Sequence, residues 1–174
     1  LDECYDVDDG YTGRWQFLFG AMDPNVSDPT GSTLGFEHDS RNELEPFSLP
    51  IISNCTLIGP ERIDALVGNL PAGHTHQNLA VLRENTRSSI FNSVLVGFAR
   101  GVSLRDGSIQ AAQNNLLRIR NTSVSSNYTG YTGSNCHDTG RWADIVTWFD
   151  TPAYANEGAT PRLQVAAERM QRAI

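Results

Sequence analysis

The chain has 174 residues, of which 39% are hydrophobic and 19% are charged, and its formal net charge is −7. This length is typical of one domain that buries a sizeable core. The acidic balance excludes nucleic acid as a partner, because no basic stripe is present to neutralise phosphates, and no apolar run reaches the roughly 18 residues of a transmembrane segment. The chain begins at Leu1 without a signal-peptide pattern, so we expect a processed or partial piece of a longer protein.

An acidic turn opens the chain. Asp6, Asp8 and Asp9 precede Gly10, and the run from Trp15 to Phe19 then alternates aromatic and other residues, which predicts a strand. Clustered carboxylate oxygens are the ligands that calcium prefers, so calcium is the candidate cofactor of this turn. The alternative is a solvated acidic turn whose aspartates accept hydrogen bonds from backbone amides.

A second acidic patch follows in the loop-rich stretch of residues 21–50. Glu37 and Asp39 are two residues apart, so they lie on the same side of an extended segment. If this segment stacks beside the first strand, both carboxylates approach Asp6 and Asp8. The candidate metal ligands are therefore the acidic residues of the two patches: Asp6, Asp8, Asp9, Glu37 and Asp39.

An eight-residue pattern occurs three times. The copies are Ile52–Gly59, Ile90–Gly97 and, more loosely, Ile119–Ser126. Each copy has an apolar residue at its first and sixth positions, and an odd separation would place these side chains on opposite faces of a continuous strand. A bend at the shared third residue restores them to one side, and asparagine tolerates the left-handed backbone that such a bend needs. The predicted structural corners are Asn54, Asn92 and Asn121.

The spacing of the copies predicts a solenoid. The corner asparagines are 38 and 29 residues apart, and a shorter echo relates Val81–Glu84 to Ser103–Asp106 with a displacement of 22. A period of about 22 residues suits a parallel β-helix, in which stacked coils bury a shared core. The longer intervals then carry insertions, which we place at Glu61–Asn78 and Ile109–Asn115.

One small side-chain layer follows from this alignment. Cys55, Ser93 and Thr122 form a small inward layer beside the corners, so Cys55 is expected to be a buried thiol. The other two cysteines, Cys4 and Cys136, are the candidate disulfide pair. Arg83–Glu84 and Arg105–Asp106 occupy matching positions; they are either carboxylates of a sugar-active site or a solvated ladder of charges.

The C-terminal part differs in pattern. Thr139–Phe149 predicts a short helix with Trp142, Ile145, Val146 and Phe149 on one face, and Thr160–Pro161 is a helix-start signal for a final helix that reaches Ile174. We therefore divide the chain into a parallel β-helix with loop insertions, residues 1–138, and a helical segment that covers or extends the solenoid, residues 139–174.

Several of these stretches resemble a family of secreted bacterial surface proteins, common in Bacteroidetes-type bacteria and often exported by type IX secretion. The similar runs are DVDDGYTGRWQF, GFEHD, PIISNCTLIGP and the WF of VTWF. The resemblance implies an all-β fold, a right-handed parallel β-helix with short C-terminal helices. It also implies an extracellular, cell-surface or periplasmic location, and it supplies no catalytic residues.

Function is less tightly constrained than fold. The main hypothesis is a structural or adhesive module without catalysis, which works inside a larger assembly with other protein subunits or with the remainder of its own precursor. The first alternative is a polysaccharide-active enzyme, since β-helices host such activities, an argument by fold analogy alone. The second is a carbohydrate-binding module that uses Trp15, Tyr128 and Tyr131.

Overall fold

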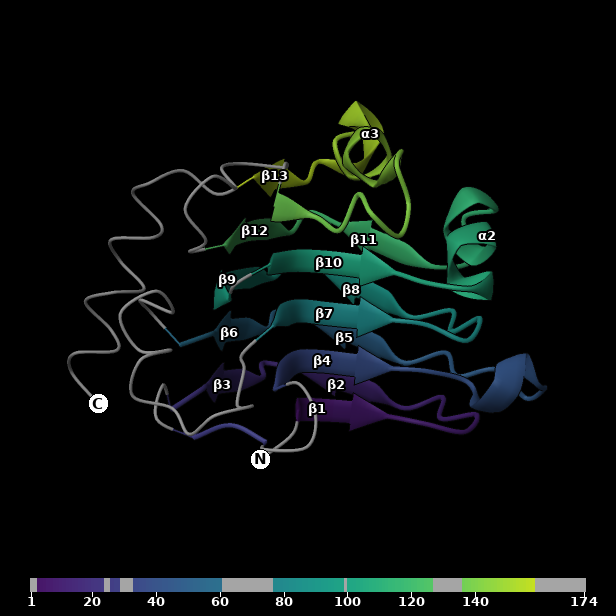
Figure 1. The fold of residues 1–174 in the computed structure, drawn as a ribbon, viewed down its shortest axis with the longest axis horizontal. Helices are drawn as coiled ribbons and strands as arrows, with labels where there is room; N and C mark the ends of the chain where they lie inside the picture. The colour runs from purple at the N-terminus through teal and green to yellow at the C-terminus, as the bar shows by residue number, and fades with distance from the viewer. Residues whose placement is uncertain are drawn as a thin grey trace.

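The computed structural model describes residues 3–23, 26–28, 33–60, 77–98, 100–126 and 136–158. Parallel strands wind through four complete coils and part of a fifth (Figure 1). The first two coils consist of β1 (Glu3–Val7), β2 (Arg14–Gln16) and β3 (Phe19–Ala21), then β4 (Leu34–His38), η1 (Arg41–Glu43), β5 (Ile51–Ser53) and β6 (Thr56–Ile58). The next two consist of β7 (Asn78–Leu82), β8 (Ser89–Phe91) and β9 (Val94–Phe98), then β10 (Arg100–Leu104), α2 (Gly107–Gln113), β11 (Arg118–Arg120) and β12 (Ser123–Ser126). The chain continues with α3 (Ile145–Phe149), η3 (Pro152–Tyr154) and β13 (Glu157–Gly158).

The strands form three sheets, and every pair of neighbouring strands is parallel. Sheet A has the order β1-β4-β7-β10, sheet B has β11-β8-β5-β2, and sheet C has β13-β12-β9-β6-β3. Each coil contributes one strand to each sheet in turn, which is the arrangement of a parallel β-helix. The predicted fold class is confirmed. None of the helices in the described ranges is long and apolar enough to cross a membrane.

The register of sheets B and C confirms the alignment of the three octets. Ile52 pairs with Ile90, and Ile90 with Ile119. The corner asparagines all have a left-handed backbone, with φ of 55° at Asn54, 47° at Asn92 and 52° at Asn121. Successive corners are also joined by hydrogen bonds: the Asn92 side-chain amide donates to Oδ1 of Asn54, and the Asn92 backbone N–H donates to the Arg120 carbonyl. A single residue thus turns the chain between the two sheets.

Two further corners lack asparagine, and the sequence analysis missed both. The run from Trp15 to Phe19 was expected to be one strand, but it breaks at Phe17 into β2 and β3. Phe17 has φ of 58°, and its N–H donates to the Ser53 carbonyl, which is the corner pattern. Ala155, with φ of 50°, occupies the same position in the fifth coil. The Asn121 N–H donates to the carbonyl of Tyr154, the residue that precedes Ala155. Backbone pairing with the neighbouring coil therefore imposes the corner even on residues that disfavour it.

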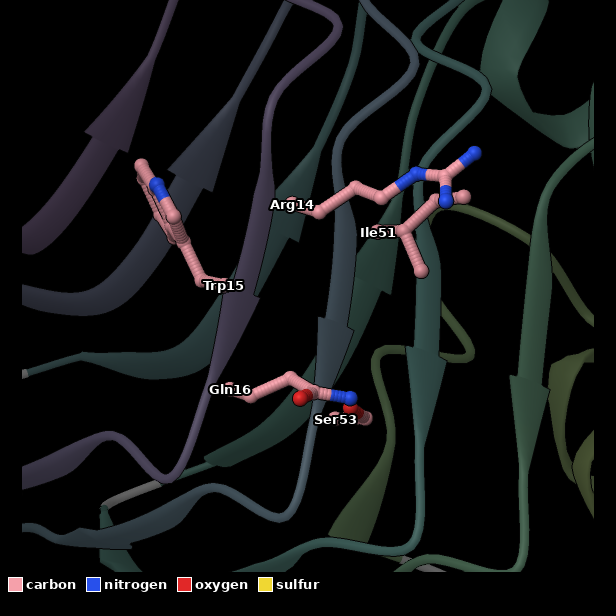
Figure 2. Close-up of a pocket in the computed structure, with 5 residues that line it drawn as sticks. All are labelled: Arg14, Trp15, Gln16, Ile51 and Ser53. Atoms are coloured by element: carbon pink, nitrogen blue, oxygen red, sulfur yellow. The ribbon is translucent and has the colours of Figure 1, made fainter.

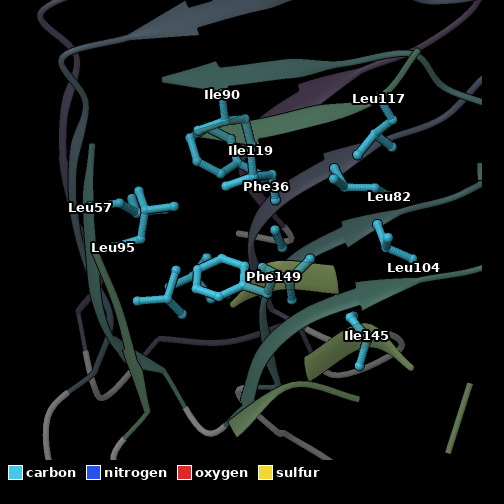
Figure 3. Close-up of a cluster of buried hydrophobic side chains, with 14 of the residues drawn as sticks. Phe36, Leu57, Leu82, Ile90, Leu95, Leu104, Leu117, Ile119, Ile145 and Phe149 are labelled. Carbon is cyan, nitrogen blue, oxygen red and sulfur yellow. The ribbon is translucent and has the colours of Figure 1, made fainter. Parts of the chain in front are cut away.

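The interior is a single apolar stack that runs through the coils (Figure 3). Leu57 and Leu95 lie together on the sheet C side, and Leu82 and Leu104 lie together on the sheet A side, with Phe36 between them. All of these side chains are fully buried. The predicted small layer is also inside: Cys55, Ser93 and Thr122 are buried, and the Ser93 hydroxyl accepts a hydrogen bond from the Cys55 N–H. Stacking supplies the core that no single coil can form.

The 22-residue echo is a true coil repeat. Ser103 pairs with Val81 and Leu104 with Leu82, so β7 and β10 begin 22 residues apart. The predicted insertion after this coil contains most of α2, which lies at one side of the stack (Figure 1). The other predicted insertion falls almost entirely on residues 61–76, which lie outside the described residues.

The end of the stack is covered by α3 (Figure 1). Ile145 and Phe149 are buried in the core, and Trp142 and Val146 pack against it, so the predicted apolar face is present. The helix is shorter than expected, and the segment after it returns to the solenoid, because β13 pairs with β12. The division at residue 138 stays a prediction. The final helix predicted to reach Ile174 lies outside the described residues.

The expected disulfide does not form. Cys4 lies in β1, whereas the Cys136 sulfur packs against Gly101 in β10, at the opposite edge of sheet A. Three strand spacings separate these edges, or about 14 Å, and a disulfide needs Cα atoms within about 7 Å. All three cysteines are free, and burial raises the pKa of the Cys55 thiol to about 12.

We predict that Asn92→Leu lowers the free energy of unfolding by about 1 to 3 kcal/mol, because leucine disfavours the left-handed backbone and cannot hydrogen-bond to Asn54. Asn92→Gly is the matched variant, since glycine adopts this backbone without strain and loses only the side-chain hydrogen bond. Urea unfolding of both variants and the wild type checks the order. Equal losses for leucine and glycine would show that the side chain, not the backbone angle, makes the corner.

Candidate functional site

The outward face of sheet A carries a cluster of charged side chains from successive coils. In-register pairing places Asp6 beside Glu37 on this face. The same column of outward side chains continues with Val81 in the third coil and Ser103 in the fourth. Directly after the strands, the Asp39 N–H donates to the Val7 carbonyl and the Arg83 N–H donates to the His38 carbonyl. This continued pairing places Asp8, Asp39 and Arg83 side by side at the ends of their strands. The face is therefore acidic at its first two coils and basic from the third.

Arg83 is the centre of this cluster. Its Nη2 lies 3.1 Å from Oε1 of Glu37 and 3.0 Å from Oδ2 of Asp39, and its Nε donates to the same Asp39 oxygen at 3.1 Å. Asp39 is buried, and the exposed fraction of the Glu37 side chain is 18%. Two adjacent nitrogens of the planar guanidinium thus bind two carboxylates at once.

The fourth coil adds a polar relay beside this cluster. The Arg105 Nε donates to the Ser103 hydroxyl at 3.1 Å, and that hydroxyl donates to Oδ2 of Asp138 at 2.9 Å. Burial lowers the pKa of the Arg105 guanidinium, and the nearby charge of Arg141 lowers it further. The charge of Asp138 has the opposite effect and raises the pKa of Arg105.

The carboxyl group of Asp39 is unusual in this cluster. Burial raises its pKa, the hydrogen bond and charge of Asp8 raise it further, and Arg83 opposes both, so that the pKa is about 7. Asp39 therefore holds a proton below about pH 7. When Asp39 loses this proton, its charge is repelled by that of Asp8, which costs stability.

The five predicted metal ligands are only partly brought together. Asp6, Asp8, Glu37 and Asp39 converge, as expected, whereas Asp9 turns away and lies 4.0 Å from Nη1 of the exposed Arg41. Two of these carboxylates, Glu37 and Asp39, form ion pairs with the Arg83 guanidinium. Among the described residues no group of three potential ligands has metal-binding geometry. Calcium binding by this cluster stays a prediction.

Sequence reasoning identified the carboxylates but not their partner. Arg83 was considered with Glu84 as part of either a sugar-active site or a solvated ladder, and its pairing with Asp39 was missed because it spans 44 residues. The adjacent Glu84 has a structural task, since its Oε2 accepts the backbone N–H of Asn42 at 2.7 Å. The 22-residue echo was the only signal that marked Arg83, and it related the residue to Arg105 rather than to Asp39.

A buried polar chain lies next to the cluster and was also missed. His38 follows Glu37 on the inward side of β4, and its Nδ1 is 2.9 Å from the Ser88 hydroxyl, which is 2.9 Å from the hydroxyl of Thr86. Burial lowers the pKa of His38 to about 3, so the ring is neutral near physiological pH. Serine and threonine are too common in turns for the sequence to mark such a chain.

Comparison with known proteins gives one finding. A family model for a pectate-lyase like beta helix domain matches residues 1–166. Neither the curated proteins nor the solved structures contain a significant match.

We predict that Asp8→Asn changes the pH dependence of stability. The folded pKa of Asp39 is above its unfolded value of 3.8, so the folded state holds the proton more tightly, and stability falls as pH rises from about 4 to about 7. Asparagine removes the like charge, so the variant should lose less stability over this range and exceed the wild type by about 1 kcal/mol or less at pH 8, because solvent screens the pair.

Melting temperatures of both proteins between pH 4 and pH 8 provide the check. The contributions of buried His38 and His137 are the same in both proteins and cancel in the difference. Asp9→Asn is the control, since Asp9 lies in the same turn but contacts Arg41 instead. A control variant that flattens the profile as much as Asp8→Asn would contradict the role given to the Asp8–Asp39 pair.

Proposed function

The chain belongs to the pectate-lyase-like β-helix domain family, and on that basis we propose that it is a rigid module of an extracellular or cell-surface protein. In this proposal the module works without catalysis inside a larger assembly, in the role of a scaffold or an adhesin. Secretion by a bacterial type IX route, which the sequence resemblance implied, stays a prediction. Calcium has no part in the proposal.

The observation that carries the proposal is the edge of the first coil. β1, β2 and β3 each end their sheets, so within the described residues each pairs with a strand on one side only. Phe17 and Phe19 lie along this edge with exposed fractions of 77% and 54%. Edge strands with apolar side chains pair readily with strands of another chain or segment. The occupant we propose is a further β-coil, from the remainder of the precursor or from a neighbouring subunit.

Phe17 strengthens this argument. A bulky aromatic residue with φ of 58° is rare and costs on the order of 1 to 3 kcal/mol, and such strain is typical of functional sites. The other internal corners in the first four coils are asparagines, which tolerate this backbone. An exposed aromatic ring in a strained position is explained if the ring packs against a partner.

A second candidate function is supported by the charged face of sheet A. Arg83 and Arg105 lie among carboxylates, and sugar-active enzymes use such groups as acids, bases and substrate anchors. Here, however, Arg83 binds Glu37 and Asp39, and Asp138 accepts from Ser103, so these groups satisfy one another. The face therefore supports a stabilising ladder of charges better than a catalytic site.

We predict that the chain releases no new reducing ends when it is incubated with a panel of acidic and neutral polysaccharides. The physical reason is that its arranged carboxylates are engaged in ion pairs and hydrogen bonds. Sustained release that is abolished by Arg83→Gln or Asp39→Asn, in variants that remain folded, would replace the scaffold proposal with the enzyme.

We also predict that the chain associates through the edge of the first coil, which light scattering over a range of protein concentrations would show as a rising mass. The double variant Phe17→Asn with Phe19→Ser should weaken association about tenfold or more, because it removes both exposed rings. Phe17→Asn alone should raise the free energy of unfolding by about 0.5 to 1 kcal/mol, since asparagine relieves the strained backbone.

Leu44→Asn is the matched control, because Leu44 is 65% exposed but lies in the turn after η1. It should leave association unchanged. A wild-type chain that stays monomeric at high concentration, or a control variant that dissociates as readily as the double variant, would refute the proposed interface.

A further inference from the structure

The C-terminal end of the solenoid is closed by a cap, which we define as residues 136–149 and which ends with α3. β10 is the last strand of sheet A, so its outer edge has no further strand among the described residues. The cap takes the place of such a strand. The Val102 N–H donates to Nδ1 of the His137 ring at 3.1 Å, and the Val102 carbonyl accepts the Asp138 N–H at 3.0 Å. An imidazole ring thus provides the acceptor that a fifth strand would otherwise supply.

The His137 ring is buried between β10 and α3. The residue is 2% exposed, and the centre of its ring lies 4.3 Å from that of the Phe149 ring. A Cβ at Gly101 would lie 2.6 Å from the Cys136 sulfur and 2.9 Å from Nδ1 of His137, so glycine leaves room for both side chains. The end of sheet A is therefore shaped to receive the cap.

The hydrogen bond from Val102 determines where the neutral His137 ring carries its proton. Nδ1 accepts this bond, so the proton is on Nε2, which is buried and has no hydrogen-bond partner among the described residues. A second proton would go to Nδ1, where it would oppose the Val102 N–H and place a charge in the interior. The closed cap is therefore compatible with the neutral ring and not with the charged one.

The groups that surround this ring leave it without a compensating charge. Asp138 follows His137 directly, but its Oδ2 accepts the Ser103 hydroxyl at 2.9 Å, and Ser103 also accepts from Arg105. Burial is the cause that lowers the pKa of His137 from its ordinary value of 6.5 to about 4. The titratable and charged side chains of the cap, of β10 and of the residues just after each are those of Arg100, Arg105, Cys136, Asp138, Arg141, Asp144 and Asp150.

We propose that His137 is the latch of an acid-released cap: protonation of its ring breaks the hydrogen bond from Val102, and residues 136–149 separate from the end of the solenoid. Release uncovers the outer edge of β10 and the part of the core that Ile145 and Phe149 cover. The closed cap is most stable above about pH 6.5, and this stability is lost as the pH falls toward 4, because the folded pKa is lower than the pKa of a released ring.

The first coil provides the contrast, because aromatic rings pack at the interior there. Figure 2 shows Trp15 directed away from Arg14 and Gln16, and the Trp15 ring packs against the core. Its centre lies 5.9 Å from that of the Tyr5 ring and 5.4 Å from that of the Tyr11 ring. None of these rings gains a charge as the pH falls. Acid release therefore concerns the end opposite the proposed interface, and neither proposal depends on the other.

The Cys136 thiol reports the state of the cap, since it is 1% exposed and packs against Gly101. The test measures how fast a dipyridyl disulfide modifies this thiol in the full chain with Cys4→Ser and Cys55→Ser, where it is the single thiol. At each pH the rate is divided by that of the same chain in urea, which removes the pH dependence of the thiol itself. We expect this ratio to rise about tenfold or more between pH 7.5 and pH 5.

His137→Asn in the same chain is the matched variant. The asparagine Oδ1 takes roughly the place of Nδ1, so it keeps an acceptor for Val102 but cannot be protonated. All the other charged groups remain, so the difference from the parent chain isolates the ring. The rise in Cys136 labelling between pH 7.5 and pH 5 should disappear. Fast labelling at both pH values would also support the latch, provided that the rest of the chain stays folded, because the ring would then be what holds the cap closed.

A second reporter separates release of the cap from unfolding of the whole solenoid. The chain with Cys4→Ser and Cys136→Ser keeps Cys55 as its single thiol, which is buried in the core at the corner between β5 and β6. Its labelling requires the coils themselves to open, for example through protonation of the buried His38. At pH 5 we expect Cys55 to be labelled about tenfold or more slowly than Cys136.

Three results would overturn the proposal. The first is a Cys136 ratio that stays constant between pH 7.5 and pH 5 in the parent chain, and the second is an unchanged pH dependence in His137→Asn. The third is equal labelling of Cys55 and Cys136 at pH 5, which would mean that acid unfolds the whole solenoid. A chain that fails to self-associate would refute the interface at the first coil and leave all three measurements unaffected.

Discussion

The left-handed residue at the corner between sheets B and C is the constraint on which the structure depends. A strand alternates its side chains with a period of two, so a one-residue bend is needed to keep both flanking apolar residues inside. Once the bend is set in one coil, hydrogen bonds from each corner N–H to the next coil impose it on that coil as well. The strength of this coupling is visible at Phe17 and Ala155, which adopt the same backbone without the chemistry that favours it.

Strict register between coils has a second consequence, which is the separation of charge. Parallel pairing places the equivalent residues of successive coils on top of one another. Each outward column of side chains therefore has its own composition. Sheet A carries Asp6, Glu37 and Asp39 close to Arg83, which forms ion pairs with the last two. Sheet B carries Arg14 and Arg118 in one column with no carboxylate between them. Sheet A therefore presents a face on which carboxylates pair with arginine, whereas the outward arginines of sheet B form no ion pair with a carboxylate of the described residues.

These two faces bear differently on function within the pectate-lyase-like β-helix family. The sheet A cluster makes stability pH-dependent, because burial and the neighbouring Asp8 raise the pKa of Asp39 to about 7. The outward arginines of sheet B contribute little to the core, since Arg14 and Arg118 are exposed. Function on such a solenoid is expected where ordered side chains have no partner within the chain, and the exposed Phe17 and Phe19 at the edge of the first coil fit that description.

The sequence by itself determined the coil, the asparagine corners, the inward layer of Cys55, Ser93 and Thr122, and the convergence of Asp6 and Asp8 with Glu37 and Asp39. These features follow from local backbone preference and from a repeat that recurs within the chain, and both can be read without coordinates. The tertiary structure alone decided that Arg83 occupies the centre of the carboxylates, that Cys4 and Cys136 stay apart, and that Phe17 is a corner. Each of these depends on which residues from distant coils become neighbours. Insertions of unequal length hide that register from the sequence, and hydrogen bonds between the stacked strands set it.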